Sequence, residues 1–334
     1  MNSLNKPCSE IEPKKVNEDK KIEIVLKIEF EKEKNEIYRV YEISDNRLAV
    51  EFDKCIKIYS LKNFKLITNI EHERIDNSIE LKNKDIAIHD YSTVNFYKLS
   101  ENDYVFYQKL SEEGKIYEIY ELKNETLALC IRRQINLYSK SNEGYQNISK
   151  IKLGETVANI LEIKDNILFI FEKSRSGTFA TADYSPYSLE ILNFEKKKIK
   201  PLCYGDFSYY NDDSLTYSGC DSIIKKNKYL LVRYANNFDI YDIENYEDIK
   251  CIYKLERNKN PKDFPSNFLH LANFNDDNFL VLQNKDIYKY DEISNKIIFV
   301  KKLEIEMEKI IDVIKLKNNY WVAYNKNEIF LIKC

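Results

Sequence analysis

The sequence is poor in the residues that build several kinds of functional site. It holds six glycines, three histidines and one tryptophan in 334 residues. The glycines are spread singly, which excludes a glycine-rich phosphate loop. His72, His89 and His270 have no ligand spacing between them, so we expect no metal site. Without a Gly-x-Ser-x-Gly motif or a recognisable Cys/His pairing, the sequence predicts no catalytic residues and no cofactor.

Long apolar runs are missing as well. No stretch approaches the roughly 18 apolar residues of a transmembrane helix. Residues 1–20 are rich in charged residues and lack the apolar core of a secretory signal, so we expect a disordered tail. The seven cysteines are odd in number and never form a Cys-x-x-Cys pair, which favours reduced thiols. We therefore expect a cytoplasmic protein, with the nucleus as the alternative, that has no membrane partner.

Neither sign of charge dominates. Lysine and arginine total 52 and aspartate and glutamate total 55, which gives a net charge of −3. Duplex binding needs many phosphate-neutralising cations on one face, and the longest basic run is the three lysines at 196–198. The sequence therefore predicts no nucleic-acid partner.

What the sequence does contain is a repeat. An apolar residue, a polar turn with Asn or Asp and a short apolar run recur together, and in four copies an apolar-x-apolar-Tyr phrase begins eight residues after the central residue of the copy. Each copy predicts a strand, a tight turn and two further strands, and a fourth strand follows in most copies. Four antiparallel strands about every 40 residues are typical of a β-propeller blade. The copies centre on Leu48, Ile86, Leu127, Leu168, Leu230, Leu280 and Val322.

The repeat predicts an all-β fold over residues 21–334, a seven-bladed β-propeller of four-stranded antiparallel blades. The last copy is one strand short, and residues 21–31 form an unpaired strand upstream of the first copy. We expect this N-terminal strand to pair with the last blade and close the ring. If its five alternating apolar side chains are half-buried or more, the strand contributes roughly 4–8 kcal/mol before entropy. Those side chains are Ile22, Ile24, Leu26, Ile28 and Phe30.

The run of residues 48–59, Leu-Ala-Val-Glu-Phe-Asp-Lys-Cys-Ile-Lys-Ile-Tyr, resembles the repeat core of the WD-repeat β-propellers. The resemblance covers about residues 21–334 and implies a non-enzymatic scaffold for protein partners. Tyrosine stands where that family has its signature tryptophan, and the family's Gly-His pair is absent. The hydrogen-bond network of that family is thus largely missing, and we expect aliphatic and tyrosine packing to hold the blades together. Small residues in the second strands should allow this packing, and they are Ala49, Ala87, Ala128 and Ala323.

Three insertions predict a contact surface. Residues 173–188 expand a link between the second and third strands of a blade, and residues 203–218 and 258–267 expand links between blades. All three emerge at the same face of a propeller. Aromatic residues in flexible surroundings favour protein contact, so we expect a protein or peptide partner here and a monomeric propeller within a complex. Solvated loops without a partner are the alternative reading. The candidate binding residues are Tyr184, Tyr187, Tyr204, Phe207, Tyr209, Tyr210, Tyr217 and Phe264.

Two other functions stay open. A propeller hydrolase or lyase would need three or more carboxylates converging at the mouth of the central channel. Asp45, Asp165 and Asp277 instead fall in turns, where aspartate is an ordinary turn former. The run of residues 131–134, Ile-Arg-Arg-Gln, resembles the Arg-Arg-Gly motif of phosphoinositide-binding propellers but lacks its glycine. We expect exposed turn arginines there.

Overall fold

A computed structural model describes most of the chain. The described residues are 23–30, 36–101, 103–154, 156–165, 167–173, 184–193, 198–208, 220–234, 237–256, 271–273, 278–281, 286–294, 296–302, 310–316 and 320–333. They form 28 β-strands and one short 3₁₀-helix, η1 (Tyr246–Asp248). No helix in this part of the chain is long and apolar enough to cross a membrane.

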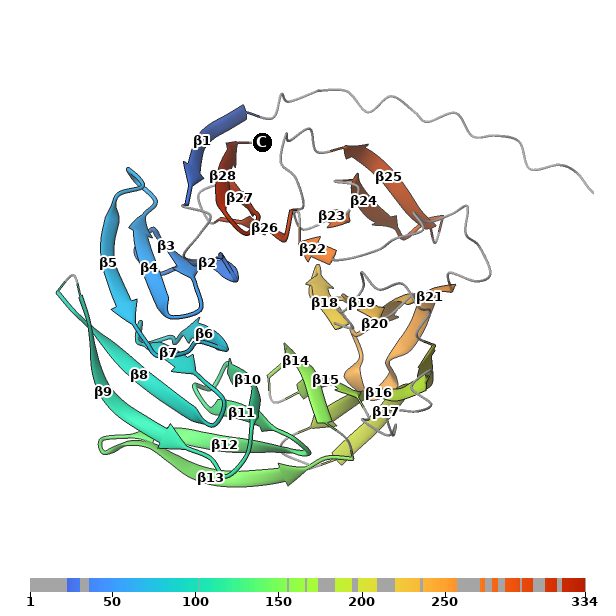
Figure 1. Ribbon diagram of the computed structural model, residues 1–334. Coiled ribbons are helices and arrows are strands. Elements are labelled where there is room, and N and C mark those ends of the chain that lie inside the picture. The colour runs from blue at the N-terminus through green and yellow to red at the C-terminus, as the bar shows by residue number, and fades with distance from the viewer. Residues whose placement is uncertain are drawn as a thin grey trace, which may run out of the picture.

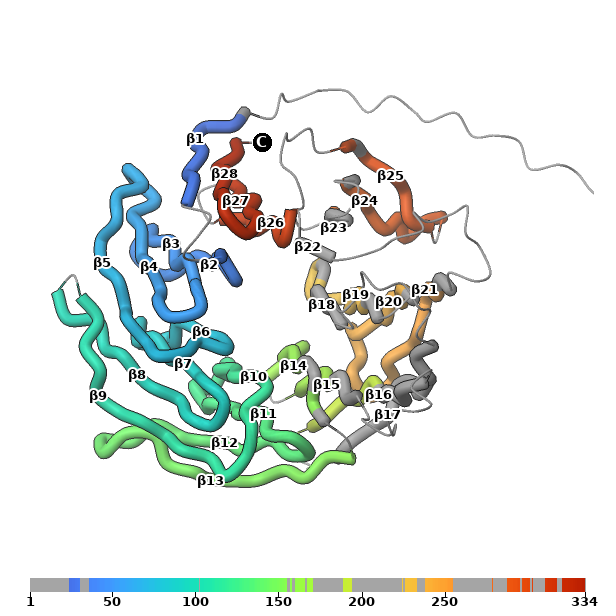
Figure 2. Tube along the Cα trace, viewed as in Figure 1, coloured from blue at the N-terminus to red at the C-terminus, as the bar shows by residue number. Residues whose placement is uncertain are grey.

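The strands group into seven four-stranded sheets that stand around a common centre (Figure 1). In each sheet the neighbouring strands are antiparallel. They also follow one another in the chain, except that β1 joins the last sheet from the other end of the chain. In six sheets the strand nearest the centre is the first of its sheet in chain order, and in the closing sheet it is β26, with β1 outermost, as the trace in Figure 2 also shows. The expected β-propeller of four-stranded antiparallel blades is confirmed.

The first three blades are the most completely described. They are β2 (Arg39–Ile43), β3 (Arg47–Glu51), β4 (Cys55–Ser60) and β5 (Leu66–Glu71); β6 (Asn77–Glu80), β7 (Ile86–His89), β8 (Thr93–Ser100) and β9 (Asp103–Ser111); and β10 (Ile116–Glu121), β11 (Leu127–Ile131), β12 (Gln134–Ser141) and β13 (Gly144–Lys152).

The next three blades continue the same order. They are β14 (Thr156–Lys164), β15 (Ile167–Lys173), β16 (Tyr184–Asn193) and β17 (Lys198–Ser208); β18 (Cys220–Lys225), β19 (Tyr229–Tyr234), β20 (Asn237–Asp242) and β21 (Lys250–Glu256); and β22 (Leu271–Asn273), β23 (Asn278–Val281), β24 (Asp286–Asp291) and β25 (Lys296–Lys302).

The remaining blade contains strands from both ends of the chain. It consists of β26 (Asp312–Lys315), β27 (Tyr320–Tyr324), β28 (Glu328–Lys333) and β1 (Glu23–Glu29), and Figure 1 shows β1 beside β28. The two strands are antiparallel, with Leu26 opposite Leu331 and Ile28 opposite Ile329. The expected pairing of the N-terminal strand with the last blade is therefore confirmed.

The expected burial of that strand is only partly confirmed. A register shift between Ile24 and Leu26 adds Val25 to β1, and Ile24 and Val25 are 43% and 47% exposed. Leu26, Ile28 and Phe30 remain partly buried, and Ile22 lies outside the described residues. The strand therefore contributes less than the five alternating side chains predicted.

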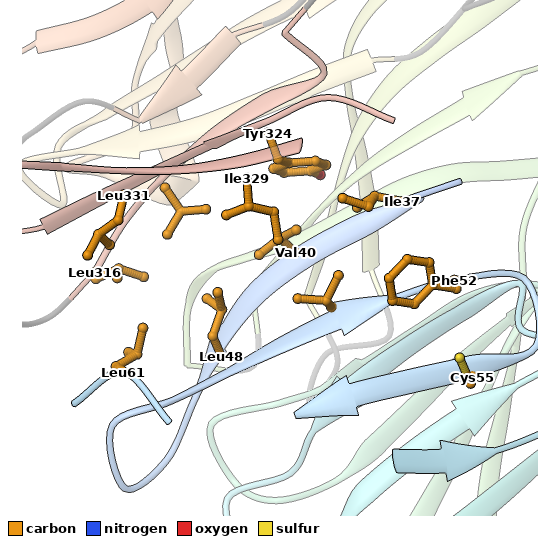
Figure 3. Close-up of a cluster of buried hydrophobic side chains, with 12 residues drawn as sticks. Ile37, Val40, Leu48, Phe52, Cys55, Leu61, Leu316, Tyr324, Ile329 and Leu331 are labelled. Atoms are coloured by element: carbon orange, nitrogen blue, oxygen red, sulfur yellow. The ribbon is translucent and has the colours of Figure 1, made fainter. Parts of the chain in front are cut away.

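A hydrophobic cluster joins the closing blade to the first one (Figure 3). Leu316, Tyr324 and Leu331 pack there with Val40 and Leu48. Between the first two blades a small second-strand residue does what the sequence predicted: Ala49 is fully buried in a cluster with Ile86 and Ile88 of the second blade. Ala87, Ala128 and Ala323 are also fully buried. The prediction of small residues at the crowded positions between blades is confirmed.

Packing is not the only connection between blades. In each of three consecutive blades, a glutamate on the innermost strand accepts hydrogen bonds from the first turn of the preceding blade. Glu80 Oε2 accepts from the backbone N of Ser44 at 2.7 Å and from its hydroxyl at 2.9 Å. Glu121 and Glu162 accept in the same way from the backbone N of Lys82 and Lys123, at 2.7 and 2.8 Å. We call Glu80, Glu121 and Glu162 the interblade carboxylates. They add to the expected packing a repeated set of hydrogen bonds between blades that the sequence analysis did not predict.

Candidate functional site

The loops of this propeller leave the blades at two ends. Because neighbouring strands are antiparallel, the link between the second and third strands leaves from the same end as the link to the next blade. We call this end the upper face. In the first two blades it carries residues 52–54, between β3 and β4, and residues 72–76, between β5 and β6. The turns held by the interblade carboxylates lie at the opposite end.

A pocket opens on the upper face where the first blade meets the second. Its volume is about 530 Å³. Tyr38 stands at the start of the first blade, Glu51 ends β3, and the other lining residues belong to the two links just named. The lining residues are Tyr38, Glu51, Asp53, Lys54, Glu73, Arg74, Ile75 and Asp76.

A hydrogen-bond network lies next to this pocket and starts at Arg39. The guanidinium of Arg39 donates to the side-chain oxygen of Asn77 and, at 2.9 Å, to the backbone oxygen of Ser78. The Ser78 hydroxyl donates to Glu51 Oε2 at 2.5 Å. Asn77 Nδ2 donates to Glu118 Oε1 at 2.7 Å. The network thus links the innermost strands of three consecutive blades, β2, β6 and β10.

Burial dominates the electrostatics of this network. Desolvation raises the pKa of the Glu51 carboxyl, although the Ser78 hydroxyl and Arg39 oppose the shift. Desolvation likewise raises the pKa of Glu118, against the opposing effects of Arg39 and Asn77. The neighbouring His89 is 1% exposed, and burial lowers its pKa, so its imidazole is neutral near pH 7.

Three carboxylates therefore lie near one another, because Glu51 acts electrostatically on Glu118 and Asp76 acts on Glu51. Arg39 acts electrostatically on both Glu51 and Glu118. We expected a channel-mouth enzyme to show such a convergence, so the geometry keeps that alternative open. Among the described residues, no group of three or more His, Cys, Asp or Glu side chains could hold a metal ion.

The carboxylates considered from the sequence lie elsewhere. Asp45 occupies a turn with φ of 63° and pairs with Arg47 and Lys84, as expected of a turn former. Asp165 pairs with Lys123 at 3.0 Å. Asp277 lies outside the described residues.

The candidate aromatic residues fall into two groups. The backbone of Tyr184 and Tyr187 lies in β16, and that of Tyr204 and Phe207 lies in β17. The prediction of loops at residues 184–188 and 203–208 is therefore wrong. These segments pair with each other, Tyr187 opposite Gly205, and lengthen the β16–β17 hairpin at its upper-face end. Four candidates lie outside the described residues, and they are Tyr209, Tyr210, Tyr217 and Phe264.

The paired arginines occupy the turn that the sequence predicted. Arg132 and Arg133 lie between β11 and β12, both exposed, and Arg132 has a φ of 46°. They sit on the upper face but do not line the pocket.

Sequence reasoning missed the Arg39 network, although a signal was present. Three residues after Leu48, Ile86 and Leu127, the apolar column is interrupted by Glu51, His89 and Cys130. All three are buried, and they stand opposite Arg39, Asn77 and Glu118 across the strand pairs. A polar or thiol residue at the same position of three consecutive repeats therefore marks the residues that stand opposite the Arg39 network.

Comparison with known proteins supports the fold. No protein-family profile and no curated protein sequence matches the chain. Among solved structures, the chain is similar to virginiamycin B lyase from Staphylococcus aureus, with a TM-score of 0.61 and 12% identity over 94% of this chain and 100% of that chain. It is also similar to a streptogramin B lyase, with a TM-score of 0.58 and 12% identity over 92% of this chain and 97% of that chain. At this identity the likeness shows a shared propeller fold.

Proposed function

We propose that this chain is a non-enzymatic propeller, comparable to a WD-repeat scaffold, that binds a protein or peptide partner across its upper face. The pocket between the first two blades carries the proposal. Its lining combines an exposed tyrosine with charged side chains of both signs, a composition that suits protein recognition. The Arg39 network beside it holds Glu51 in place, so the pocket is formed before a partner arrives.

The lengthened β16–β17 hairpin extends the proposed surface. Its upper-face end carries four of the aromatic residues that the sequence singled out, Tyr184, Tyr187, Tyr204 and Phe207. A partner that covers both the pocket and this hairpin would span a large part of the upper face. We propose the pocket as the primary contact and the hairpin as the secondary one.

Affinity capture from the native cell tests the proposal, with three forms of the full chain as bait. The wild type is compared with Tyr38→Ser and with Phe106→Ser. Tyr38 and Phe106 are exposed to a similar extent, 55% and 51%, but Phe106 lies on the outer strand β9, away from the pocket. We expect a set of proteins captured by wild type and Phe106→Ser and lost with Tyr38→Ser. Equal capture by all three baits would contradict the proposal.

A propeller lyase is the second candidate. The proximity of Glu51 to both Asp76 and Glu118 favours it, and two lyases share the fold. Incubation of the purified chain with a streptogramin B, followed by chromatography of the intact antibiotic, tests this candidate. Consumption that is lost in Glu51→Gln would replace the binding proposal with the lyase.

A further inference from the structure

We infer that the pocket between the first two blades receives a basic side chain, lysine or arginine, presented by a segment of the partner protein. The inference rests on the proposed function and names the chemistry that the partner must bring. Three observations support it. They are the acidic lining of the pocket, a buried carboxylate oxygen without a hydrogen-bond partner among the described residues, and the exposed aromatic ring of Tyr38 at the rim.

The charge of the pocket favours a cation. Its lining holds four acidic residues against the two basic residues Lys54 and Arg74. Arg74 is already engaged, because its Nε donates to Asp76 Oδ1 at 2.8 Å. Three further carboxylates then face the single ammonium of Lys54. An anionic ligand would meet more repulsion than attraction here.

Two acceptors are placed to receive donors. Glu51 is only 3% exposed, and the Ser78 hydroxyl orients its carboxylate from one side. Asp76 Oδ2 is buried and has no hydrogen-bond partner among the described residues. A buried carboxylate oxygen without a donor is costly, and a guanidinium or ammonium offers several N–H donors at once. A basic side chain in the pocket would lie beside the Asp76 carboxylate and would reach the shielded Oδ2 after a small shift of the lining side chains.

The rim of the pocket suits the same ligand. Tyr38 is 55% exposed, yet its backbone N donates to the backbone oxygen of Glu51 at 2.9 Å. The tyrosine therefore projects from a fixed backbone beside the carboxylates. An aromatic ring in this position can contact both the aliphatic stem and the charged head of lysine or arginine. The neighbouring Ile75, which is buried, adds apolar surface for the stem.

Defined peptide pools test the inference with the full chain. Four pools of bead-displayed heptapeptides carry arginine, lysine, glutamine or glutamate at the centre and random residues elsewhere, and binding of the fluorescently labelled protein is measured. We expect the arginine and lysine pools to bind at least about five-fold more protein than the other two. Glu73→Gln combined with Asp76→Asn should abolish this preference. A control pair, Glu125→Gln with Glu143→Gln, removes two exposed carboxylates away from the pocket and should retain it.

The outcomes separate this inference from the proposed function. If Tyr38→Ser weakens all four pools equally and the central residue makes no difference, the upper face binds peptides but the basic side chain is the wrong ligand. If the preference survives in the Glu73→Gln/Asp76→Asn variant, the carboxylates of the pocket are not the receptor. Absence of binding to every pool would also overturn the inference, while the capture experiment with Tyr38→Ser decides the proposed function independently.

Discussion

The closing strand β1 allows a quantitative test of how the ring is held shut. We consider the triple variant Leu26→Ala, Ile28→Ala and Phe30→Ala, because these three side chains are partly buried against the cluster that joins the closing blade to the first. Full burial of such a side chain is worth roughly 1.5–3 kcal/mol, so half burial of three of them should contribute about 3 kcal/mol. An unfolding entropy of about 2.1 cal/mol/K per residue over 334 residues converts this loss into a decrease in Tm of about 4 °C.

The strand supplies its own control. Ile24→Ala with Val25→Ala removes apolar side chains from the same strand, but both are already exposed. Thermal unfolding followed by circular dichroism should show the decrease in the triple variant and less than about 1 °C in the double variant. Equal Tm values for the two variants would refute the reasoning that β1 stabilises the ring by burial.

Removal of the whole strand should have a different consequence. A chain that begins at residue 31 leaves β28 paired with β27 only, and the edge that carries the buried Ile329, Leu331 and Ile332 loses the cover of β1. An unpaired apolar edge favours association with other chains. Size-exclusion chromatography should show oligomers, and a stable monomer of unchanged Tm would contradict the closure of the ring by β1.

Three further predictions concern single side chains. Because burial raises the folded-state pKa of Glu118 above its unfolded value, stability is lost as the pH rises from the unfolded pKa to the raised pKa, and Glu118→Gln should raise Tm at pH 8 but not at pH 4; a gain independent of pH would contradict this. Glu162→Ala removes an interblade carboxylate and should lower the free energy of unfolding in urea by roughly 1.5–3 kcal/mol, whereas the exposed Glu125→Ala should change it by less than about 0.5 kcal/mol. Ala87→Leu should cost about 1–3 kcal/mol by overpacking a fully buried position, and an unchanged urea midpoint would show that the neighbouring blade can move aside.

The repeat made the fold predictable because its signal is local. The eight-residue spacing between Leu48 and Ile56 recurs between equivalent apolar residues in later copies. Each copy also contains its own turn, so no knowledge of distant contacts was needed. The pairing of β1 with β28 followed from the strand missing at the other end. The bulge at Val25 did not follow, because a register shift depends on how one particular strand fits its partner.

The pocket was harder to predict than the fold. Tyr38, Glu51 and Asp76 are far apart in the sequence, and none of them belongs to a known motif. Their meeting depends on the angle between two blades. The lengthened β16–β17 hairpin escaped prediction for a related reason, since its Ser-, Gly- and Tyr-containing ends are typical of loops and only the pairing of Tyr187 with Gly205 makes them strand.

The interblade carboxylates also determine where foreign sequence can be inserted. The backbone amides of Ser44, Lys82 and Lys123 are each held by a side chain of the neighbouring blade, so an epitope tag or fluorescent reporter inserted at these turns would pull the amide away from its carboxylate. The tip between β12 and β13, at residues 142–143, is exposed and forms part of an outer hairpin. A reporter placed there leaves every one of these three contacts intact and keeps the upper face accessible for labelling studies.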